Sequence, residues 1–459
     1  MSDLLNIVIL AAGQGKRMNS KLPKVLQPIS QKPMLQHVIE TAKKLTPHKL
    51  IVVYGHGGEQ VQNYMNEVFP NEITWALQDK QLGTGHALKC ALPHLDKTGA
   101  TLVLYGDVPL ISADTLKALQ SKLNNNLVML SDLMTNPTGY GRVVRDATNN
   151  ICAIVEEKDA NDREKKIQEV NTGFYAFSNS HLEKWLNSLS NENAQGEYYL
   201  TDVVAMAYQD KLSVESITAP NAYEVMGVNN KLQLEELERI HQINQANQLL
   251  VSGATLIDKR RIDIRGDVSV GQDCTIDVNC VFEGNVQLGN NVSIGAGCIL
   301  KNVTIADNVT IKPYSILEDA TVDSGAQVGP YARLRPGAKL AQNTHVGNFV
   351  EIKKSTVGVG SKVNHLTYIG DSEIGSGVNI GAGTVTCNYD GKNKFKTTIG
   401  DNVFIGSGSM LVAPVEIGNG ALIGAGSVVT KNAPENELTV ARAKQITVGG
   451  WLKKKKGNN

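Results

Sequence analysis

Apolar residues recur at every sixth position through most of the second half of the chain, and this period constrains the fold more than any other feature. Three runs keep it: Ile264, Val270, Ile276, Phe282, Leu288, Ile294 and Leu300; Val322, Val328, Leu334, Leu340, Val346 and Ile352; and Ile399, Ile405, Leu411, Ile417, Ile423 and Val429. A glycine often follows the apolar residue, as Gly271 does, and a smaller residue such as Ser409 or Ala421 stands two places before it. Large and small inward side chains then alternate around short strands. The pattern predicts a parallel β-helix whose coils bury these positions against their neighbours.

Several interruptions break the six-residue period. Single-residue slips occur at 300–305, 317–322, 352–357 and 369–374. The one large interruption, "TCNYDGKNKFKT" at 386–397, is expected to project as a loop. After about residue 432 the repeat is expected to end, and the final lysines should form a solvated, frayed tail.

The first half of the chain has a different organisation. Up to about residue 228, short apolar runs such as "NIVILAA" (6–12), "KLIVVYG" (49–55) and "TLVLYGD" (101–107) alternate with amphipathic stretches such as 33–45. This alternation predicts a doubly wound, Rossmann-like α/β domain with a largely parallel sheet and ligands at the strand C-termini. Residues 229–252 have helical spacing and a closing Ser-Gly. The expected organisation is a domain at 1–228, a linker helix at 229–252 and a β-helix domain at 253–459.

The amino-acid composition indicates which kinds of partner and which cellular compartment to expect for this protein. Lysine plus arginine and aspartate plus glutamate number 45 each, so no bulk field favours nucleic acid or an anionic membrane as partner. The six cysteines are scattered without a CxxC pair, which fits a reducing cytoplasm. "LLNIVILAA" near the start is too short to span a membrane and indicates a buried strand. A cytoplasmic protein acting on small molecules is expected.

A glycine-rich loop, "LAAGQGKRM" (10–18), follows the first predicted strand. Gly13 and Gly15 can bring backbone N–H groups close to a phosphate, and Arg17 adds charge. The loop is not the dinucleotide fingerprint, because Met18 stands at the third glycine position, and no Gly-Lys-Ser/Thr follows to make a Walker A loop. The second strand also ends in "YGHGG" rather than an acidic ribose ligand, which argues against NAD.

Further polar residues follow this loop, and their order along the chain is more informative about function than any single residue. Lys24 in "LPK" can neutralise a phosphate, and Gln78 can pair with a base edge beside the Gly83-Thr84-Gly85 turn. Asp107 in "YGDVPL" ends a strand and is a natural Mg²⁺ ligand. Each of these residues taken alone could be structural.

Together these motifs resemble the sugar-phosphate nucleotidyltransferase family, and the match continues with "GYGR" (139–142), Glu156, Asn171 and Asn229. The resemblance implies attack of a sugar 1-phosphate on a nucleoside triphosphate with release of pyrophosphate, and Mg²⁺ held by Asp107 and Asn229. The implied binding residues are Leu10, Ala11, Ala12, Gly13, Gly15, Arg17, Lys24, Gln78, Gly83, Thr84, Tyr105, Gly106, Asp107, Gly141, Glu156, Asn171 and Asn229. Lys16 departs from the family, which commonly has threonine there.

One copy of the repeat, "SKVNHLTYIG" (361–370), carries a histidine and a tyrosine. Val363 and Ile369 are core positions and Thr367 is the small inward residue, so His365 and Tyr368 should point outward. A lone outward histidine is usually a solvated residue. Here further outward residues, Arg335, Lys353, Asn388 and Tyr389, accompany it. A cleft with a basic rim and one histidine suits an anionic substrate that must lose a proton.

These residues resemble the hexapeptide-repeat acyltransferases. This resemblance implies that three hexads form each coil of the β-helix and that the coils wind in a left-handed sense. With both halves, the linking helix and "VARAKQ" (440–445), nearly the whole chain resembles a family of bifunctional enzymes. His365 would be the general base that deprotonates the amine of glucosamine 1-phosphate as it attacks acetyl-CoA. Arg335 and Lys353 would hold the sugar phosphate, Tyr368 and Asn379 the sugar. The residues implied to line the site or contact acetyl-CoA are Asn388, Tyr389, Ala382, Ser407, Ala425 and Arg442. The resemblance also implies a homotrimer with sites between β-helices.

The predicted function is therefore two consecutive reactions. The second half acetylates glucosamine 1-phosphate, and the first half transfers UMP from UTP to N-acetylglucosamine 1-phosphate, giving UDP-N-acetylglucosamine for bacterial envelope precursors. The choice of uracil rests on the resemblance, because one glutamine amide can pair with several bases. One alternative is a nucleotidyltransferase whose β-helix is structural or regulatory. Another is a binding or scaffold protein without catalysis.

Overall fold

The computed structural model describes residues 4–13, 15–55, 57–124 and 126–451. The chain divides into two compact units between His241 and Gln242, which lies inside the helix α7 (Lys231–Val251). This helix lies within the segment 229–252, which was predicted as a linker helix, and the final lysines of the predicted tail lie outside the described residues. Within the part of the chain described, no helix is long and apolar enough to cross a membrane.

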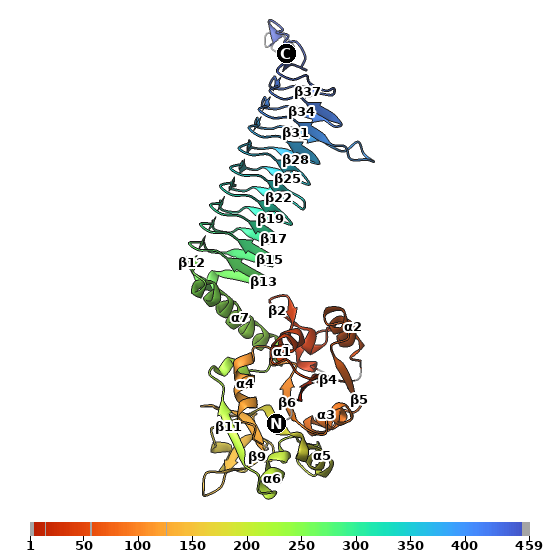
Figure 1. Ribbon diagram of the computed structural model, residues 1–459, viewed down its shortest axis with the longest axis vertical. Coiled ribbons are helices and arrows are strands. Elements are labelled where there is room, and N and C mark those ends of the chain that lie inside the picture. The colour runs from red at the N-terminus through yellow and green to blue at the C-terminus, as the bar shows by residue number, and fades with distance from the viewer. Residues whose placement is uncertain (1–3, 14, 56, 125, 452–459) are drawn as a thin grey trace, which may run out of the picture. The chain divides into compact units, whose positions relative to one another are not determined.

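The first unit is built on one twisted sheet (Figure 1). Its main path runs β11-β7-β10-β6-β1-β4-β5. The strands are β1 (Leu5–Leu10), β4 (Lys49–Gly55), β5 (Thr74–Gln78), β6 (Ala100–Tyr105), β7 (Leu127–Leu133), β10 (Glu169–Ser178) and β11 (Val214–Thr218). All pair in parallel except β10, which is antiparallel to both neighbours. Every residue of β1 is buried, as expected for a central strand covered on both faces.

Helices cover both faces of this sheet and bury separate apolar clusters. One cluster contains residues of α1 (Met34–Lys43), α2 (Glu59–Val68) and α4 (Ala113–Ser121). The other contains residues of α3 (Thr84–Ala91), α5 (Asn179–Ser188) and α6 (Asp202–Gln209). Two short hairpins complete the unit, β2 (Pro28–Ile29) with β3 (Lys32–Pro33), and β8 (Arg142–Arg145) with β9 (Ile151–Val155). The doubly wound prediction is confirmed.

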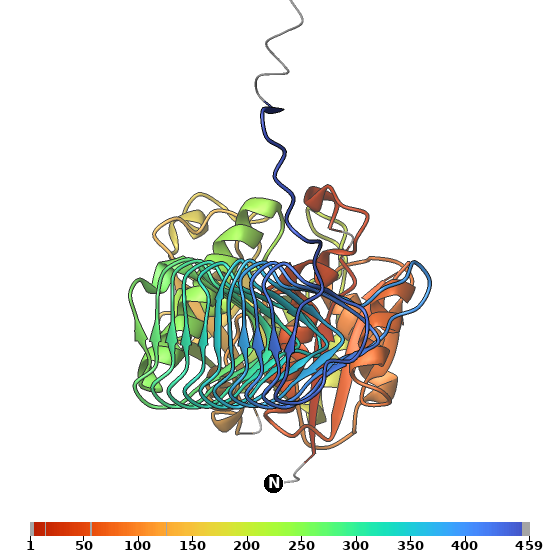
Figure 2. The same ribbon diagram turned by 90° about the horizontal axis from the view of Figure 1, so that it is seen from above.

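The second unit is a left-handed parallel β-helix with three faces (Figures 1 and 2). Face 1 holds β12 (Thr255–Leu256), β14 (Thr275–Ile276), β16 (Ser293–Ile294), β18 (Thr310–Ile311), β21 (Gln327–Val328), β24 (His345–Asn348), β27 (Lys362–His365), β30 (Asn379–Ile380), β33 (Phe404–Ile405), β36 (Leu422–Ile423) and β38 (Leu438–Thr439). Face 2 holds β19 (Ile316–Glu318), β22 (Arg333–Leu334), β25 (Glu351–Lys353), β28 (Tyr368–Gly370), β31 (Val385–Cys387), β34 (Met410–Val412) and β37 (Val428–Val429). Face 3 holds β20 (Thr321–Val322), β23 (Lys339–Leu340), β26 (Thr356–Val357), β29 (Ser372–Ile374), β32 (Thr397–Ile399) and β35 (Val415–Ile417). The longer strands β13 (Ile262–Val270), β15 (Cys280–Leu288) and β17 (Ile299–Ile305) each run through both face 2 and face 3.

The register of the strands explains the slips in the period. Ile276 pairs with Ile294, so the coil between them spans three full hexads. Ile294 pairs with Ile311, so the next coil is one residue shorter than three hexads. Each predicted slip contains a non-glycine residue with positive φ at the turn from face 2 to face 3; these are Asn302 (50°), Asp319 (44°), Lys354 (46°) and Asp371 (48°). A single left-handed residue therefore makes a tighter turn there without moving the apolar positions off the core.

Two further predictions concern the end of the β-helix. The loop between β31 and β32 projects from the coils in both views, as expected for 386–397 (Figures 1 and 2). The expectation that the repeat ends after about residue 432 is wrong, because β38 pairs with β36 and Ala433 bridges to Ile417. Leu438 points outward like its partner Leu422, and the inward position of β38, opposite Ile423, is Thr439, so this strand gave no apolar signal in the six-residue period.

Candidate functional sites

A cavity of about 280 Å³ lies at the carboxyl ends of β1, β5 and β6, where a doubly wound sheet binds ligands. Its lining is Leu10, Ala11, Ala12, Gly13, Lys24, Val25, Gln78, Gln81, Gly83, Thr84, Ala87, Tyr105, Asp107 and Glu197. Ten of these are sequence-predicted binding residues. Gln81 and Glu197 were not predicted. The remaining predicted residues lie outside this wall: Gly15, Arg17, Gly106, Gly141, Glu156, Asn171 and Asn229.

The glycine loop packs closely over Lys24. Gly15 has a φ of 60°, and a Cβ placed on it would lie 2.5 Å from the Cβ of Lys24. Ala11 N–H donates to Val53 O at 2.8 Å, and the Gln81 amide nitrogen donates to Ala12 O. Glycine is therefore required where the loop crosses the lysine, and Gln81 fixes the loop from the cavity side.

The two predicted metal ligands converge on one cation. Lys24 Nζ forms an ion pair with Asp107 Oδ2 and donates to Asn229 Oδ1 at 3.1 Å, and Arg17 Nη2 donates to the same Asn229 oxygen at 3.0 Å. A carboxylate and an amide oxygen that already meet around a positive group fit Mg²⁺, which prefers oxygen ligands. Among the described residues, no group of three or more histidine, cysteine, aspartate or glutamate side chains could hold a metal. Phosphate oxygens and water would have to complete the Mg²⁺ shell.

Gln78 lies at the other end of the cavity and is buried. Its amide nitrogen donates to Gly83 O at 3.0 Å and lies 3.2 Å from His86 Nδ1. Gly83 has a φ of 105°, and a Cβ there would lie 2.6 Å from Tyr198 O. The turn thus needs glycine and orients the glutamine amide. His86 was not predicted, because its role appears only when α3 folds back on β5.

Glu156, Gly141 and Asn171 form a second group beside the cavity. Asn171 N–H donates to Gly141 O at 2.8 Å, and Thr201 Oγ1 donates to Glu156 Oε1 at 3.1 Å. Burial raises the pKa of Glu156, despite the hydrogen bond from Thr201, and nearby carboxylates add to the increase. Burial also raises the pKa of Tyr105, with further contributions from the charges of Glu156 and then Asp107. Tyr105 on the cavity wall therefore lies close to both groups.

In the second unit, the chain turns from face 1 to face 2 at corner A, which comprises residues 347–350, 364–367, 381–384, 406–409 and 424–427 and includes the ends of β24 and β27. Backbone bonds run along it from Gly383 N to His365 O (3.3 Å), from Gly408 N to Ala382 O (2.7 Å) and from Gly426 N to Ser407 O (2.8 Å). Arg442 Nη1 extends the row by donating to Ala425 O at 2.7 Å. The predicted acetyl-CoA residues Ala382, Ser407, Ala425 and Arg442 thus follow His365 in one line, one coil apart.

His365 is exposed, as predicted, and its ring is held from one side. His365 Nδ1 lies 3.1 Å from Asn348 Oδ1. Because an amide oxygen accepts, this contact favours the tautomer with the proton on Nδ1 and leaves Nε2 with a lone pair. Asn348 was not predicted, since it lies a whole coil earlier and the register between β24 and β27 brings it to the histidine.

Replacing Asn348 by alanine should slow acetyl transfer about tenfold, a part of the roughly 10²–10⁴-fold that a positioned base contributes. The imidazole would lose the partner that fixes its tautomer. Asn348→Asp should instead move the pH profile of acetyl transfer upward, because a carboxylate favours the charged imidazole. CoA release measured against pH tests both variants, with the exposed Gln342→Ala as control in the same coil. An unchanged rate and profile in both would remove Asn348 from the site.

Corner B joins faces 2 and 3 at 335–338, 354–355, 371 and the 388–396 loop, and it gathers positive charge. The Arg335 guanidinium donates to Glu351 Oε1 at 2.8 Å, which raises the pKa of Arg335. Contact with Lys394 of the loop lowers the pKa of Lys353, and Arg335 contributes further. Three cations therefore lie close together, as needed to bind a phosphate. Lys394 and Glu351 were not predicted.

The other predicted residues are divided among the faces. Asn388 is buried and donates from Nδ2 to Asp371 Oδ2 at 2.5 Å, while Tyr389 is exposed on the loop. Tyr368 lies on face 2 between the two corners, and Asn379 lies on face 1. One chain therefore carries His365 at corner A and the cationic group at corner B.

Comparison with known families agrees with both folds. The family "MobA-like NTP transferase domain" matches residues 7–163, "Bacterial transferase hexapeptide (six repeats)" matches 396–431, and "GMPPB C-terminal domain" matches 264–335. The fold and these matches define a nucleotidyltransferase joined to a hexapeptide-repeat transferase.

Full-length relatives identify the family more closely. The chain is 58% identical to the "Bifunctional protein GlmU" of Chromobacterium violaceum, with 99% of each chain covered. The proteins of that name from Acinetobacter baylyi and Neisseria meningitidis are each 54% identical, with 98% and 99% of both chains covered, respectively. The chain belongs to the GlmU family.

Proposed function

We propose that this chain carries out two consecutive reactions, with the residue roles given below. It is a bifunctional transferase with uridyltransferase and glucosamine-1-phosphate acetyltransferase activities. The product, UDP-N-acetylglucosamine, serves cell-wall synthesis. The observation that carries the proposal is the presence of two separate groups of reactive residues, around Asp107 in one unit and along corner A from His365 in the other.

Positioning and charge neutralisation suffice for uridylyl transfer, since phosphoryl chemistry needs no covalent protein nucleophile. A phosphate oxygen of N-acetylglucosamine 1-phosphate attacks the α-phosphorus of UTP, and pyrophosphate leaves. The N–H groups of Gly13 and Gly15, with Arg17, hold the triphosphate, and Lys24 neutralises charge at the α-phosphate. Gln78 and Gly83 bind the base. Gly141, Glu156 and Asn171 bind the sugar phosphate.

Asp107 and Asn229 are the proposed Mg²⁺ ligands. When bound, Mg²⁺ would supply positive charge that stabilises the negative charge developing in the transition state. Lys24 Nζ contacts both of these oxygens in this structure, so Asp107 and Asn229 already face a positive charge next to the proposed position of the α-phosphate.

His365 is the proposed general base of acetyl transfer. The amine of glucosamine 1-phosphate attacks the thioester carbonyl of acetyl-CoA, His365 Nε2 accepts the amine proton, and CoA leaves as the thiol after receiving a proton. The cations of Arg335 and Lys353 bind the sugar phosphate, while Tyr368 and Asn379 bind the sugar. Asn388, Tyr389, Ala382, Ser407, Ala425 and Arg442 line the path of acetyl-CoA.

A homotrimer is proposed, because one chain separates His365 from the cationic corner. An exposed aromatic row supports this proposal. The rings of Tyr314, Tyr331 and Phe349 stack with centroids 5.3 and 5.4 Å apart, and each is at least half exposed. Exposed apolar groups of this size mark protein interfaces. A second copy that covers this row beside His365 could supply corner B to the same site. The cytoplasm is the proposed location, in line with six free cysteines.

Tyr331→Asp should weaken the trimer, because a carboxylate would be buried in the middle of the aromatic row. Light scattering should show the mass falling toward that of a monomer, and acetyl transfer should fall with it. Uridylyl transfer should persist, since its residues lie in the first unit. Tyr64→Ser, an exposed tyrosine of α2, is the control. A trimer that keeps its mass in Tyr331→Asp would place the interface elsewhere.

A coupled assay tests the proposed function as a whole. Purified protein receives glucosamine 1-phosphate, acetyl-CoA, UTP and Mg²⁺, and CoA thiol and pyrophosphate are followed separately. Both should appear, and omission of acetyl-CoA should suppress pyrophosphate until N-acetylglucosamine 1-phosphate is added. Pyrophosphate without any release of CoA would favour a nucleotidyltransferase with a structural β-helix. Release of neither product would favour the scaffold alternative.

A further inference from the structure

The β8–β9 hairpin carries two of the proposed sugar-phosphate residues but has a narrow attachment to the sheet. Gly141 directly precedes β8, and Glu156 directly follows β9. The two strands pair with each other along their length, whereas β8 pairs with β10 at one position, Arg142 opposite Val170. The orientation of the hairpin therefore decides where Gly141 and Glu156 lie relative to Asn171 on β10.

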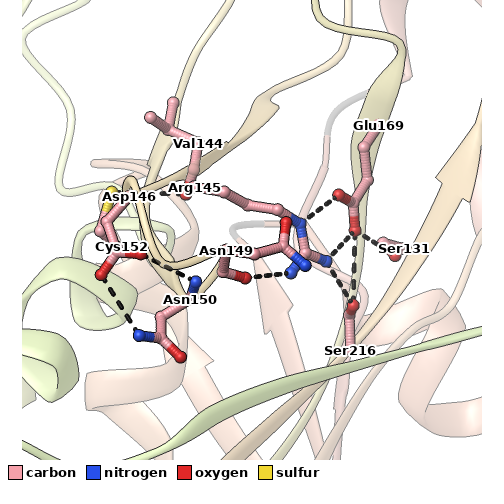
Figure 3. Close-up of polar contacts among 9 residues, drawn as sticks. All are labelled: Ser131, Val144, Arg145, Asp146, Asn149, Asn150, Cys152, Glu169 and Ser216. Carbon is pink, nitrogen blue, oxygen red and sulfur yellow. Dashed lines mark hydrogen bonds and ion pairs between the residues drawn. The ribbon is translucent and has the colours of Figure 1, made fainter.

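Arg145, at the far end of β8, bridges the hairpin to the sheet (Figure 3). Its Nε donates to Glu169 Oε2 and its Nη2 to Glu169 Oε1, both at 2.8 Å. Nη2 also donates to Ser216 Oγ at 3.1 Å. This two-pronged geometry fixes both distance and direction, which a single hydrogen bond does not.

Glu169 is held from the opposite side by the strands of the sheet. Ser131 Oγ on β7 donates to Glu169 Oε1 at 3.0 Å, and Ser216 Oγ on β11 lies 3.4 Å from the same oxygen (Figure 3). Burial disfavours the carboxylate, but hydrogen bonds from Arg145 and Ser131 outweigh burial and lower the pKa of Glu169. The carboxylate is thus a fixed anchor on three adjacent strands.

The same guanidinium also holds the hairpin turn. Arg145 Nη1 donates to Asn149 O at 3.0 Å. Within the turn, Asp146 Oδ1 accepts from Thr148 N and Asn150 N at 2.8 and 2.9 Å (Figure 3 shows Asp146, Asn149 and Asn150). Because the turn is rigid and tied to Arg145, the guanidinium connects the whole hairpin to Glu169.

We propose that Arg145 and Glu169 are positioning residues for the sugar phosphate in uridylyl transfer. They set the angle of the β8–β9 hairpin and so place Gly141 and Glu156 opposite Asn171. The inference rests on the proposed sugar-phosphate role of these three residues. Neither Arg145 nor Glu169 lines the nucleotide cavity, whose wall comes from other elements. A change in the pair should therefore act on the sugar phosphate and leave UTP binding intact.

The test uses the full-length enzyme and two mild variants. Arg145→Lys keeps the charge but loses the two-pronged geometry, and Glu169→Gln keeps the side-chain shape but loses the charge. Each should raise the KM for N-acetylglucosamine 1-phosphate about tenfold, since small misplacements of binding groups have effects of this order or larger. The KM for UTP and the rate of acetyl transfer should stay within about twofold. Lys43→Gln, which breaks an exposed ion pair of α1 with Glu72, is the control.

The outcomes separate the possibilities. An unchanged KM for the sugar phosphate in either folded variant would overturn the inference. An equal rise in the KM for UTP, or an equal effect in Lys43→Gln, would overturn it too, because it would show general loosening of the domain. If the Arg145→Lys variant does not fold, the Glu169→Gln variant still tests the inference. Its amide oxygen can keep the hydrogen bonds from the serines, so this variant should fold. If wild type forms no pyrophosphate, the proposed function fails, and the positioning role fails with it.

Discussion

Uridylyl transfer by the Asp107→Asn variant is expected to fall about 10³-fold, because a metal-bound carboxylate supports about 4 kcal/mol of transition-state stabilisation. The substitution preserves shape but removes the charge that pairs with Lys24 and would bind Mg²⁺. The Lys24 ammonium, 10% exposed, would lose its counter-charge. The measurement is pyrophosphate release from UTP and N-acetylglucosamine 1-phosphate at saturating Mg²⁺.

Acetyl transfer by the same variant should be unchanged, because no proposed residue belongs to both sites. Release of CoA from the same preparation measures it. Asp114→Asn is the matched control, since this aspartate on α4 is 95% exposed and pairs with Lys117 at 3.8 Å. Loss of both activities in a folded variant with the mass of the wild-type assembly would contradict independent sites. Retained uridylyl transfer would show that Asp107 is not a metal ligand.

The β-helix could be predicted closely from the sequence because its core repeats in a single short period. Even the four slips fall at real features, the tight turns at Asn302, Asp319, Lys354 and Asp371. The period alone could not show that these residues adopt positive φ, although asparagine and aspartate are the non-glycine residues that adopt it most readily. It also failed at β38, where Thr439 occupies the inward position opposite Ile423 and Leu438 points outward.

The nucleotide cavity could be predicted from motifs because its residues directly follow strands. Lys24, Asp107 and Asn229 are far apart in the chain, and the fold brings their side chains together at one point. Gln81 and Glu197 could not be found in this way. Gln81 acts through a contact with Ala12 across the cavity, and Glu197 comes from a segment between α5 and α6 without a motif.

Two residues that sequence reasoning missed at the proposed acetyl-transfer site depend on the register between coils, and a third depends on the loop. Asn348 reaches His365 from the coil before it, and Glu351 reaches Arg335 from the coil after it. Lys394 is a residue of the loop, bridged to Tyr389, and its charge acts on Lys353. A repeat shows which side chains point outward, but the slips and the loop decide which of them become neighbours.

Replacing His365 by alanine should lower CoA release from acetyl-CoA and glucosamine 1-phosphate at least about 10²-fold, the usual contribution of a general base. The amine would lose the Nε2 acceptor for its proton at the moment of attack. His345→Ala is the matched control, because His345 lies on β24 of the same β-helix and pairs with Lys362 rather than lying at corner A. The variant should keep the oligomeric state of the wild type, since His365 is not part of the stacked aromatic row.

The two half-reactions of His365→Ala can be separated by the substrate supplied. With glucosamine 1-phosphate, acetyl-CoA and UTP, pyrophosphate should form slowly, because the acetylated intermediate is scarce. Added N-acetylglucosamine 1-phosphate should restore pyrophosphate release to the wild-type rate, since the nucleotide cavity lies in the other unit. Rescue of pyrophosphate release without release of CoA would place the defect in acetyl transfer. It would also show that acetyl transfer precedes uridylyl transfer. Unchanged CoA release would remove His365 as the base, and the row of residues along corner A would then need another proton acceptor.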